Sequence, residues 1–434
     1  MKAYRAAIFH LVDNPVRTPN PAAAYQYWED GLLLVEKGKI KAAGPAAALL
    51  PQLPEGVPVA SYQNALIIPG LIDIHIHFPQ ITTVASYGEQ LLEWLHDYIL
   101  PGEGEYADQS LAQARAEIFL KELLRRGTTT ASVYCSLAKE SAEALFTVAQ
   151  RLNLRLLAGK VMMDRNGPEG MKLATPEADY HDCQELIEKW HGKGRLAYVV
   201  TPRFAPACSE VDLQAAARLL KEYPGLYVQT HLCENHHEIA WVRELFPERK
   251  SYLDVYDHYG LVGEKTLLGH SLHLEDEDFR RVREAGAVLC PCPPSNFFLG
   301  RGLFKFAKAR EYQAKVALGT DLGAGNTFSM FKAMEEAYKM AQLQGYSLSP
   351  FEAFYLVTLG GARALSLEDK IGNFEVGKEA DFLILDLQST PFLKFRMQFA
   401  RTLCDQLFVQ MMLGDDRAIR ETYVYGVLAH RRDT

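Results

Sequence analysis

Five polar residues of kinds that bind metal ions lie within short apolar segments of this 434-residue chain. His75 and His77 stand two places apart in LIDIHIHF, and a strand that alternates its side chains between two faces would project both on the same side. The other three are His231 in LYVQTHL, His270 in TLLGHSLHL and Asp321 in KVALGTDLG. Because imidazole nitrogen and carboxylate oxygen are ligands that Zn²⁺ prefers, these residues predict a zinc site if their segments converge.

The elements that must position these residues form a regular series. Short β-rich segments alternate with helix-like stretches, and they occupy residues 71–78, 128–134, 155–163, 196–204, 226–232, 266–274, 287–293 and 315–323. Apolar residues recur at three- and four-residue spacing in 110–127 and in 210–225, each of which ends at a glycine. Eight strands alternating with helices predict an α/β fold, a closed (β/α)8 TIM barrel. A doubly wound open sheet is the alternative, but the G-x-G-x-x-G turn it would carry after the first strand is absent.

The two ends of the chain have a different pattern. Both contain short β-like pieces separated by turns rather than strand–helix repeats. We therefore expect one small β-sandwich domain formed by both termini, from residues 1–68 and 366–434, beside a barrel at 69–365.

Active-site groups of such a barrel lie at the carboxyl ends of its strands. The five polar residues fall at the expected ends of the first, fifth, sixth and eighth strands, so we expect them to meet at one point. A single buried histidine is more often structural, but five such placements are not explained in that way. Three histidines and the aspartate could ligate a metal, and the fourth histidine or the carboxylate could hold a metal-bound water. His273 lies farther along the sixth segment, and we expect a structural role for it.

Longer motifs extend this pattern along nearly the whole chain. They are PGLIDIHIHFPQ, LLEWLHDYILPGE, TPRFAPACS, THLCEN, GHSLHL, CPPSN and LGTDLGAGNTFSM. On these motifs the sequence resembles the amidohydrolase superfamily and, within it, the guanine deaminases. The H-x-H pair and the late aspartate are common to the superfamily, whereas HFPQ, PRFAP and HLCEN are the specific part of the resemblance.

The resemblance implies a role for each matching residue. It makes His75, His77, His231 and Asp321 the metal ligands, His270 the neighbour of the metal-bound water, Glu234 the proton shuttle, and Gln80, Arg203 and Phe204 the purine-recognition residues. His231, His270 and Asp321 would also contact the substrate. The implied protein is a cytoplasmic homodimer with one Zn²⁺ per chain that hydrolyses guanine to xanthine and ammonia in purine catabolism.

These residue types suit that chemistry. Zinc lowers the pKa of a bound water to roughly 7, and Asp321 could take the proton. Attack at C2 of guanine moves charge onto N3, where Glu234 could act as a general acid. Arg203 could donate to O6 or a ring nitrogen, the amide of Gln80 could both donate and accept, and Phe204 could stack on the base.

Several alternatives stay open or are set aside at this point. Other mononuclear deaminases of the superfamily act on cytosine, adenosine or aminotriazines. Binuclear members bridge two metals with a carbamylated lysine at the end of strand 4, but the segment 196–204 has no lysine, and we expect Lys160 in strand 3 to extend toward solvent. The H-x-E and P-C-x-x-C signature of the zinc nucleoside deaminases is absent. A non-catalytic scaffold would be expected to have lost a ligand, and every ligand position here is filled.

Three residues near the seventh strand are less informative. Arg301 stands where a small residue is common in the family, and we expect its side chain to face solvent on a loop; an inward orientation would change the substrate range. Cys290 and Cys292 form a C-x-C pair, for which buried thiols are the simplest interpretation.

Composition limits the partners. The formal net charge is −8, with a sequence pI of about 5.9 and no basic run, which disfavours nucleic acid. No apolar run reaches the ~20 residues that span a bilayer, and no signal peptide is recognisable, so we expect a cytoplasmic protein with a small-molecule substrate, no nucleic-acid partner and no membrane partner. Seven widely spaced cysteines indicate reduced thiols.

Overall fold

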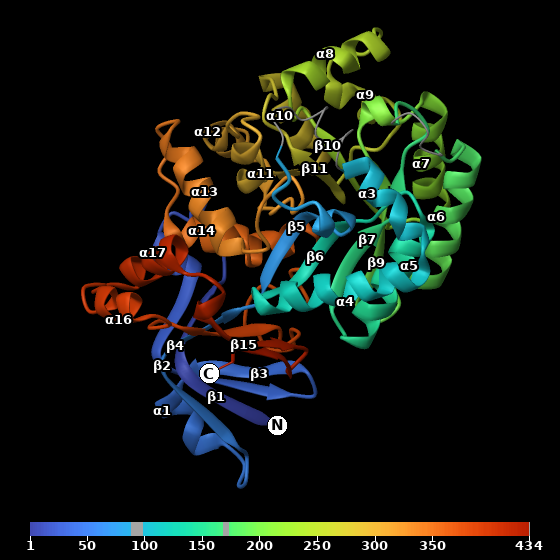
Figure 1. The fold of residues 1–434 in the computed structure, drawn as a ribbon. Helices are drawn as coiled ribbons and strands as arrows, with labels where there is room; N and C mark the ends of the chain where they lie inside the picture. The colour runs from blue at the N-terminus through green and yellow to red at the C-terminus, as the bar shows by residue number, and fades with distance from the viewer. Residues whose placement is uncertain (88–98, 168–172, 434) are drawn as a thin grey trace.

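The computed structural model describes residues 1–87, 99–167 and 173–433, which form two sheets (Figure 1). The larger sheet is parallel, with the order β13-β12-β11-β10-β9-β7-β6-β5 and with β8 paired to β9. Its strands are β5 (Leu71–His77), β6 (Thr128–Tyr134), β7 (Arg155–Gly159), β8 (Val161–Met162), β9 (Leu196–Pro202), β10 (Tyr227–Leu232), β11 (Thr266–His270), β12 (Val288–Cys290) and β13 (Lys315–Val316).

The two ends of this sheet meet and close a barrel. The Ile74 amide donates to the Leu318 carbonyl at 3.3 Å, and the Asp321 amide donates to the His75 carbonyl at 2.8 Å. These bonds join β5 to the segment that follows β13. The predicted (β/α)8 barrel is confirmed, and closure rules out the open-sheet alternative.

Helices surround the barrel and extend beyond it. They are α1 (Ala46–Leu49), α3 (Leu100–Gly104), α4 (Gln109–Arg125), α5 (Lys139–Arg151), α6 (Pro176–Trp190), α7 (Glu210–Glu222), α8 (His236–Leu245), α9 (Tyr252–His258), α10 (Asp276–Ala285), α11 (Pro293–Phe298), α12 (Phe306–Glu311), α13 (Met330–Gln342), α14 (Pro350–Leu356), α15 (Leu359–Ala364), α16 (Pro391–Met397) and α17 (Leu403–Leu413). The helices predicted at 110–127 and 210–225 are α4 and α7. Asp108 caps α4 by accepting from the Ser110 and Leu111 amides, and Ser209 caps α7 in the same way. Among the described residues, no helix combines the length and apolarity needed to cross a bilayer.

Several barrel strands are shorter than the sequence pattern predicts. The third segment is interrupted at Lys160, and only two residues of the eighth segment form a regular strand. Cys233, His270 and Asp321 have positive φ angles of 48°, 61° and 50°, so the chain leaves the extended conformation where the candidate site begins. Such backbone conformations in non-glycine residues cluster at functional sites.

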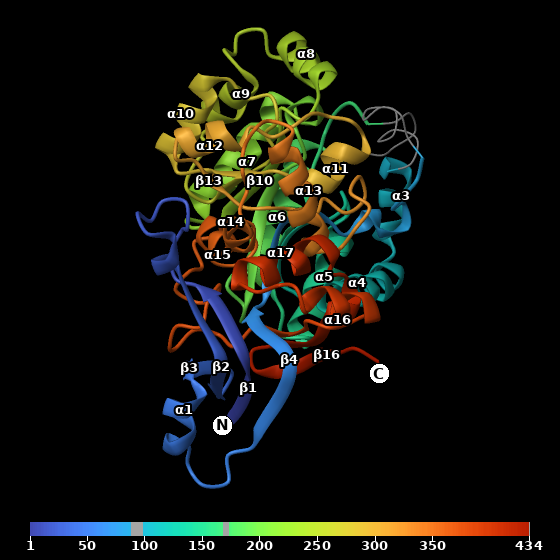
Figure 2. The same ribbon diagram turned by 90° about the vertical axis from the view of Figure 1, so that its left-hand side faces the viewer.

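The termini form the second sheet, of seven strands in the order β16-β15-β14-β4-β1-β2-β3. Its strands are β1 (Lys2–Leu11), β2 (Tyr25–Glu36), β3 (Lys39–Pro45), β4 (Val59–Pro69), β14 (Phe382–Asp386), β15 (Ile419–Val424) and β16 (Val427–Arg431). Figure 2 shows it at the end of the molecule opposite α8. The expected small β domain from both termini is therefore present as one hydrogen-bonded sheet, whereas its boundaries at residues 68 and 366 stay predictions.

Candidate metal centre and active site

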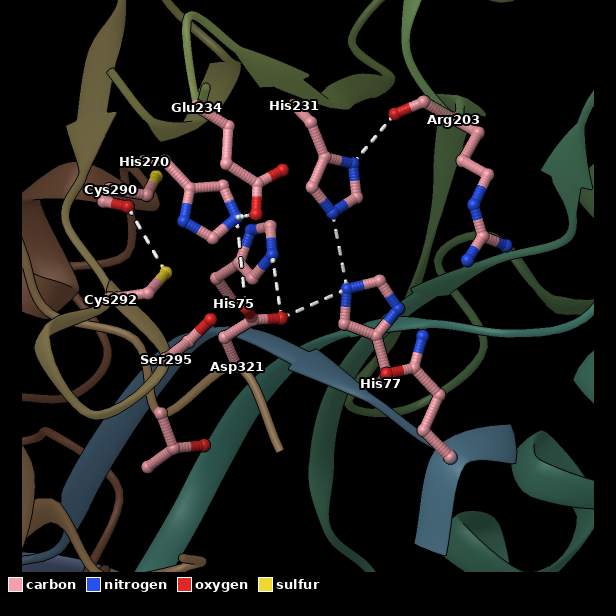
Figure 3. A network of polar contacts seen from close by, with 12 residues as sticks. His75, His77, Arg203, His231, Glu234, His270, Cys290, Cys292, Ser295 and Asp321 are labelled. Atoms are coloured by element: carbon pink, nitrogen blue, oxygen red, sulfur yellow. Dashed lines mark hydrogen bonds and ion pairs between the residues drawn. The ribbon is translucent and has the colours of Figure 1, made fainter. Parts of the chain in front are cut away.

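The five predicted polar residues meet at the carboxyl end of the barrel strands (Figure 3). The Nε2 atoms of His75 and His77 lie 3.4 and 3.1 Å from Asp321 Oδ1, and His231 Nε2 lies 3.2 Å from His77 Nε2. His270 Nε2 lies 3.6 Å from Asp321 Oδ2. All five side chains are buried.

This cluster has the composition of a metal site. One potential ligand atom from each of His75, His231, His270 and Asp321 lies within 4.8 Å of the others. That set includes His270, which the sequence assigned to a metal-bound water, and His77 adjoins it through its contacts with His231 and Asp321. The assignment of individual ligands stays a prediction.

Hydrogen bonds at the outer ring nitrogens orient two of the imidazoles. His231 Nδ1 lies 2.6 Å from the Arg203 carbonyl oxygen, to which it can only donate, and His270 Nδ1 lies 2.9 Å from Asn296 Oδ1. Each ring then turns its Nε2 lone pair toward the centre, as outer hydrogen bonds do for metal-bound histidines. The Nε2 atoms of His75 and His270 are buried without a hydrogen-bond partner, so both lone pairs are free to bind a cation. The residues present therefore fit a divalent metal ion.

Burial sets the protonation states that such ligands need. It lowers the pKa of His231 well below its ordinary value, helped by the neighbouring imidazoles, and it lowers the pKa of His270 to about 4. Burial alone would raise the pKa of Asp321, but contacts with His75 and His77 outweigh it and hold that pKa well below the usual range. Neutral imidazoles beside an ionised carboxylate can bind a cation without first losing protons.

Glu234 lies beside this cluster and not on the surface. Its side chain is buried, and one carboxylate oxygen is 3.2 Å from His270 Nε2. The backbone amide of Glu234 donates to the carboxylate of Glu238, which also closes the capping box at Asn235, the N-cap of α8. This cap turns the chain between β10 and α8 and holds Glu234 in the barrel mouth.

Arg301 corrects the prediction of a solvent-facing side chain. It is 4% exposed, pairs with the carboxylate of Glu234, and donates to the Ser295 hydroxyl at 2.9 Å. It also lies 3.6 Å from Asp321 Oδ2. Burial lowers the pKa of Arg301 to about 10, which leaves it cationic at neutral pH. The sequence misled because a charged residue in a glycine-flanked loop is usually solvated, whereas here two buried carboxylates compensate its charge.

Two of the three predicted purine-recognition residues, Arg203 and Gln80, bind one carboxylate to which the sequence pattern gives no role. Arg203 donates from both terminal nitrogens to Glu103, at 2.8 and 3.1 Å, and Gln80 Nε2 donates to Glu103 Oε1 at 3.2 Å. Phe204 is partly buried and contacts Trp241 edge-on. Glu103 ends the quoted motif LLEWLHDYILPGE, but a lone acid after Pro-Gly has no spacing signal that assigns it a role; residues 91–98 of this motif lie outside the described residues.

Two glycines make room for the first histidine. A Cβ atom at Gly269 would lie 2.6 Å from Cε1 of His75, and one at Gly319 would lie 2.6 Å from its Cβ. No side chain larger than hydrogen fits at either place without displacing His75. The glycines in GHSLHL and LGTDLG are therefore needed because the backbone passes close to His75. The sequence shows the glycines but not this contact.

Three other expectations can be compared with the structure. Lys160 does not extend toward solvent: it is 1% exposed, lies between β7 and β8, and pairs with the buried carboxylate of Asp179. Cys290 and Cys292 are buried free thiols, as expected, and burial raises the pKa of both well above the ordinary value. His273 contacts the Arg301 carbonyl at 3.0 Å, in line with a structural role.

Comparison with known proteins defines the class. The model of the amidohydrolase family matches residues 66–428, which is most of the chain. The chain belongs to the amidohydrolase family.

The particular relatives narrow this class. The guanine deaminase of Escherichia coli K12 is 48% identical over 436 residues, covering 100% of this chain and 98% of its own. A solved structure of the E. coli enzyme matches with a TM-score of 0.96 and covers 100% of both chains. A Clostridium acetobutylicum guanine deaminase, solved with guanine bound in its active site, matches with a TM-score of 0.87 at 30% identity, over 98% of this chain and 99% of its own. Within the family, the chain groups with the guanine deaminases.

Proposed function

We propose that this protein is a guanine deaminase, a hydrolase of the C–N bond at C2 of guanine that releases xanthine and ammonia. The observation that carries the proposal is one buried site that combines a metal-binding group, a carboxylate beside it and a set of lactam-reading donors. The 48% identity to a curated guanine deaminase over the whole chain supports it, as does the related enzyme that holds guanine.

We assign the metal ligands to His75, His77, His231 and Asp321, with His270 beside them, and we propose one zinc ion per chain. Zinc supplies a water whose pKa falls to roughly 7. The outer hydrogen bonds from His231 and His270 support this assignment, because they fix which ring nitrogen faces inward.

The protein's own groups then manage the protons. Asp321, held ionised, accepts a proton from the attacking water, and His270 orients that water through Nε2. Glu234, 3.2 Å from His270 Nε2, takes up in turn the two protons that this water gives up, one of them by way of Asp321. It passes one to N3 of guanine and the other to the departing amine, and so ends ionised as it began. Arg203 and Gln80 bind the lactam edge, and Phe204 packs against the base. Because these polar groups are buried away from water, each of these interactions is stronger than it would be in solvent.

Three further properties belong to the same proposal. We propose a homodimer that works in the cytoplasm in purine catabolism. The seven free cysteines, six of them buried, support a reducing compartment.

Substrate discrimination tests the proposal. Zinc-loaded protein is incubated separately with guanine, adenine, cytosine and ammeline, and ammonia release is followed. We expect guanine to be turned over with the highest kcat/KM. Faster turnover of another amine with none of guanine would assign the site to a different deaminase, and absence of all turnover together with substoichiometric metal would favour a scaffold.

A further inference from the structure

Glu103 of α3 is the residue that joins the two predicted purine-recognition groups. It is 2% exposed, and Arg203 and Gln80 are equally buried. One carboxylate accepts two hydrogen bonds from the fork of Arg203 and a third from Gln80. α3 lies outside the barrel strands, so this carboxylate joins the segment after β9 and the turn after β5 in one hydrogen-bonded unit.

The arrangement fixes which donors remain for a ligand. A guanidinium has five N–H groups, and the bidentate contact with Glu103 uses two of them. The remaining N–H groups of Arg203 keep a set direction because a two-point contact between planar groups prevents rotation. In Figure 3 the Arg203 side chain extends away from Glu234 and His270, so these donors face a different part of a bound base from the reacting carbon.

Gln80 is constrained from two sides. Its Nε2 donates to Glu103, and a Cβ atom at Gly323, whose φ is 122°, would lie 1.8 Å from its Oε1. The amide therefore lies against the backbone at Gly323 and cannot exchange its two ends without losing the bond to Glu103. This leaves an acceptor and a second N–H of known orientation on Gln80.

We propose that Glu103 is a positioning residue for substrate specificity, which rests on the proposed function: it holds Arg203 and Gln80 in the orientation that reads the O6 and N1–H edge of a neutral lactam purine. The Glu103–Arg203 pair carries no net charge, so it offers directed donors without attracting an anionic ligand. Glu103 itself contacts neither the metal group nor the reacting atoms. Its removal should thus weaken binding of the lactam edge and leave the chemical step intact.

The test compares E103Q with wild type on guanine and on 2-aminopurine, which has the same amino-bearing ring but lacks O6 and N1–H. A glutamine keeps the shape but presents an N–H group to donors, so we expect KM for guanine to rise at least about 10-fold while kcat stays within about 3-fold. We expect kcat and KM for 2-aminopurine to change little. The ratio of kcat/KM for guanine to that for 2-aminopurine should then fall by about the factor by which KM for guanine rises. Equal losses for both purines, or a fall in kcat alone, would overturn the proposal.

A matched control separates positioning from simple stability. Glu379 also binds two arginines and lies far from the barrel mouth. Its Oε2 accepts from Nε of Arg155 at 3.0 Å and from Nε of Arg195 at 2.9 Å. We expect E379Q to lower the melting temperature without changing KM. If E103Q shows that pattern too, Glu103 is only structural. If E103Q does not fold, E103D decides: it keeps the charge but is one methylene short, and unchanged discrimination in it would contradict the proposal.

Equilibrium binding keeps this test separate from that of the proposed function. In an E234Q background, the Kd of guanine is measured by calorimetry with and without E103Q. We expect Kd to rise at least about 10-fold when E103Q is added, matching the kinetic change. If wild type binds guanine without turning it over and E103Q still raises the Kd, the deaminase is contradicted and the positioning role is upheld. A Kd that E103Q does not change would contradict the positioning role alone.

Discussion

The Nδ1 atom of His231 lies 2.6 Å from the backbone carbonyl oxygen of Arg203. This bond connects a candidate metal ligand on β10 to the residue directly after β9, whose side chain is predicted to contact the substrate. The orientation of the histidine is therefore set by the same peptide that carries the recognition group. One of the candidate metal ligands and one of the candidate recognition residues are thus joined directly through neighbouring segments of the barrel.

Replacing Glu234 by glutamine should reduce kcat for guanine by about 10²–10⁴-fold, the usual value of a general acid–base. Bound zinc should be unchanged, because Glu234 adjoins His270 and is not among the four clustered ligand atoms. Steady-state kinetics and metal analysis of the same preparation measure both. Loss of zinc in this variant would make Glu234 a ligand.

Removing the metal should abolish activity and lower thermal stability together. The buried Nε2 atoms of His75 and His270 make no hydrogen bond within the protein and would be ligands for the cation, and a ligand that binds only the folded state at 100 times its Kd contributes about 2.7 kcal/mol. Chelation followed by calorimetry and zinc titration measures this. If chelation removed all of the zinc and the melting temperature stayed unchanged, the result would argue against a metal site formed by these residues.

Arg301→Met should lower kcat/KM at least about 10-fold, because it leaves the Glu234 carboxylate buried beside Asp321 without its cation. Arg301→Lys should retain more activity, since it keeps the charge. The kcat/KM values of both variants for guanine check this. Wild-type kinetics in Arg301→Met would mean that the ion pair has no part in the reaction.

The fold was largely predictable from the sequence, and the site was so in part. The alternation of strands and helices predicts the barrel. Polar residues at the ends of its strands predict the site, because the carboxyl ends of parallel strands lie at one edge of the sheet. Glu103 and Arg301 were not assigned correctly, since their roles depend on which carboxylates and cations lie nearby in space. The positive φ angles of His270 and Asp321 likewise follow from tertiary contacts and have no signature in residue type.

Lys160→Met should destabilise the protein by about 3–5 kcal/mol, because it leaves the buried carboxylate of Asp179 unpaired. Metal content and the KM of the folded fraction should stay as in wild type. Denaturant unfolding and kinetics at low temperature measure the two effects. A loss of bound metal instead would indicate a bridging lysine of the binuclear kind.

Stability should rise with pH between about 4 and 6.5 through His10, which packs against Trp28 and Phe374 in the terminal sheet. Burial lowers its pKa from 6.5 to about 4, so the unfolded chain binds more protons in this window and acid favours unfolding. Its contribution is complete above pH 6.5 and is lost as pH falls, up to about 3 kcal/mol at the limit. Urea titrations of wild type and H10Q across this range check it, and equal slopes for the two would contradict it.

Isotope incorporation during turnover tests hydrolytic deamination most directly. Zinc-loaded protein is given guanine in water enriched in ¹⁸O, and the purine product is identified by mass spectrometry. We predict xanthine that carries a single ¹⁸O at C2 and one ammonia released per guanine, with both products formed about 10²–10⁴-fold more slowly by E234Q. Guanine recovered unchanged by the zinc-loaded wild type, or a product without the label at C2, would contradict the proposed reaction.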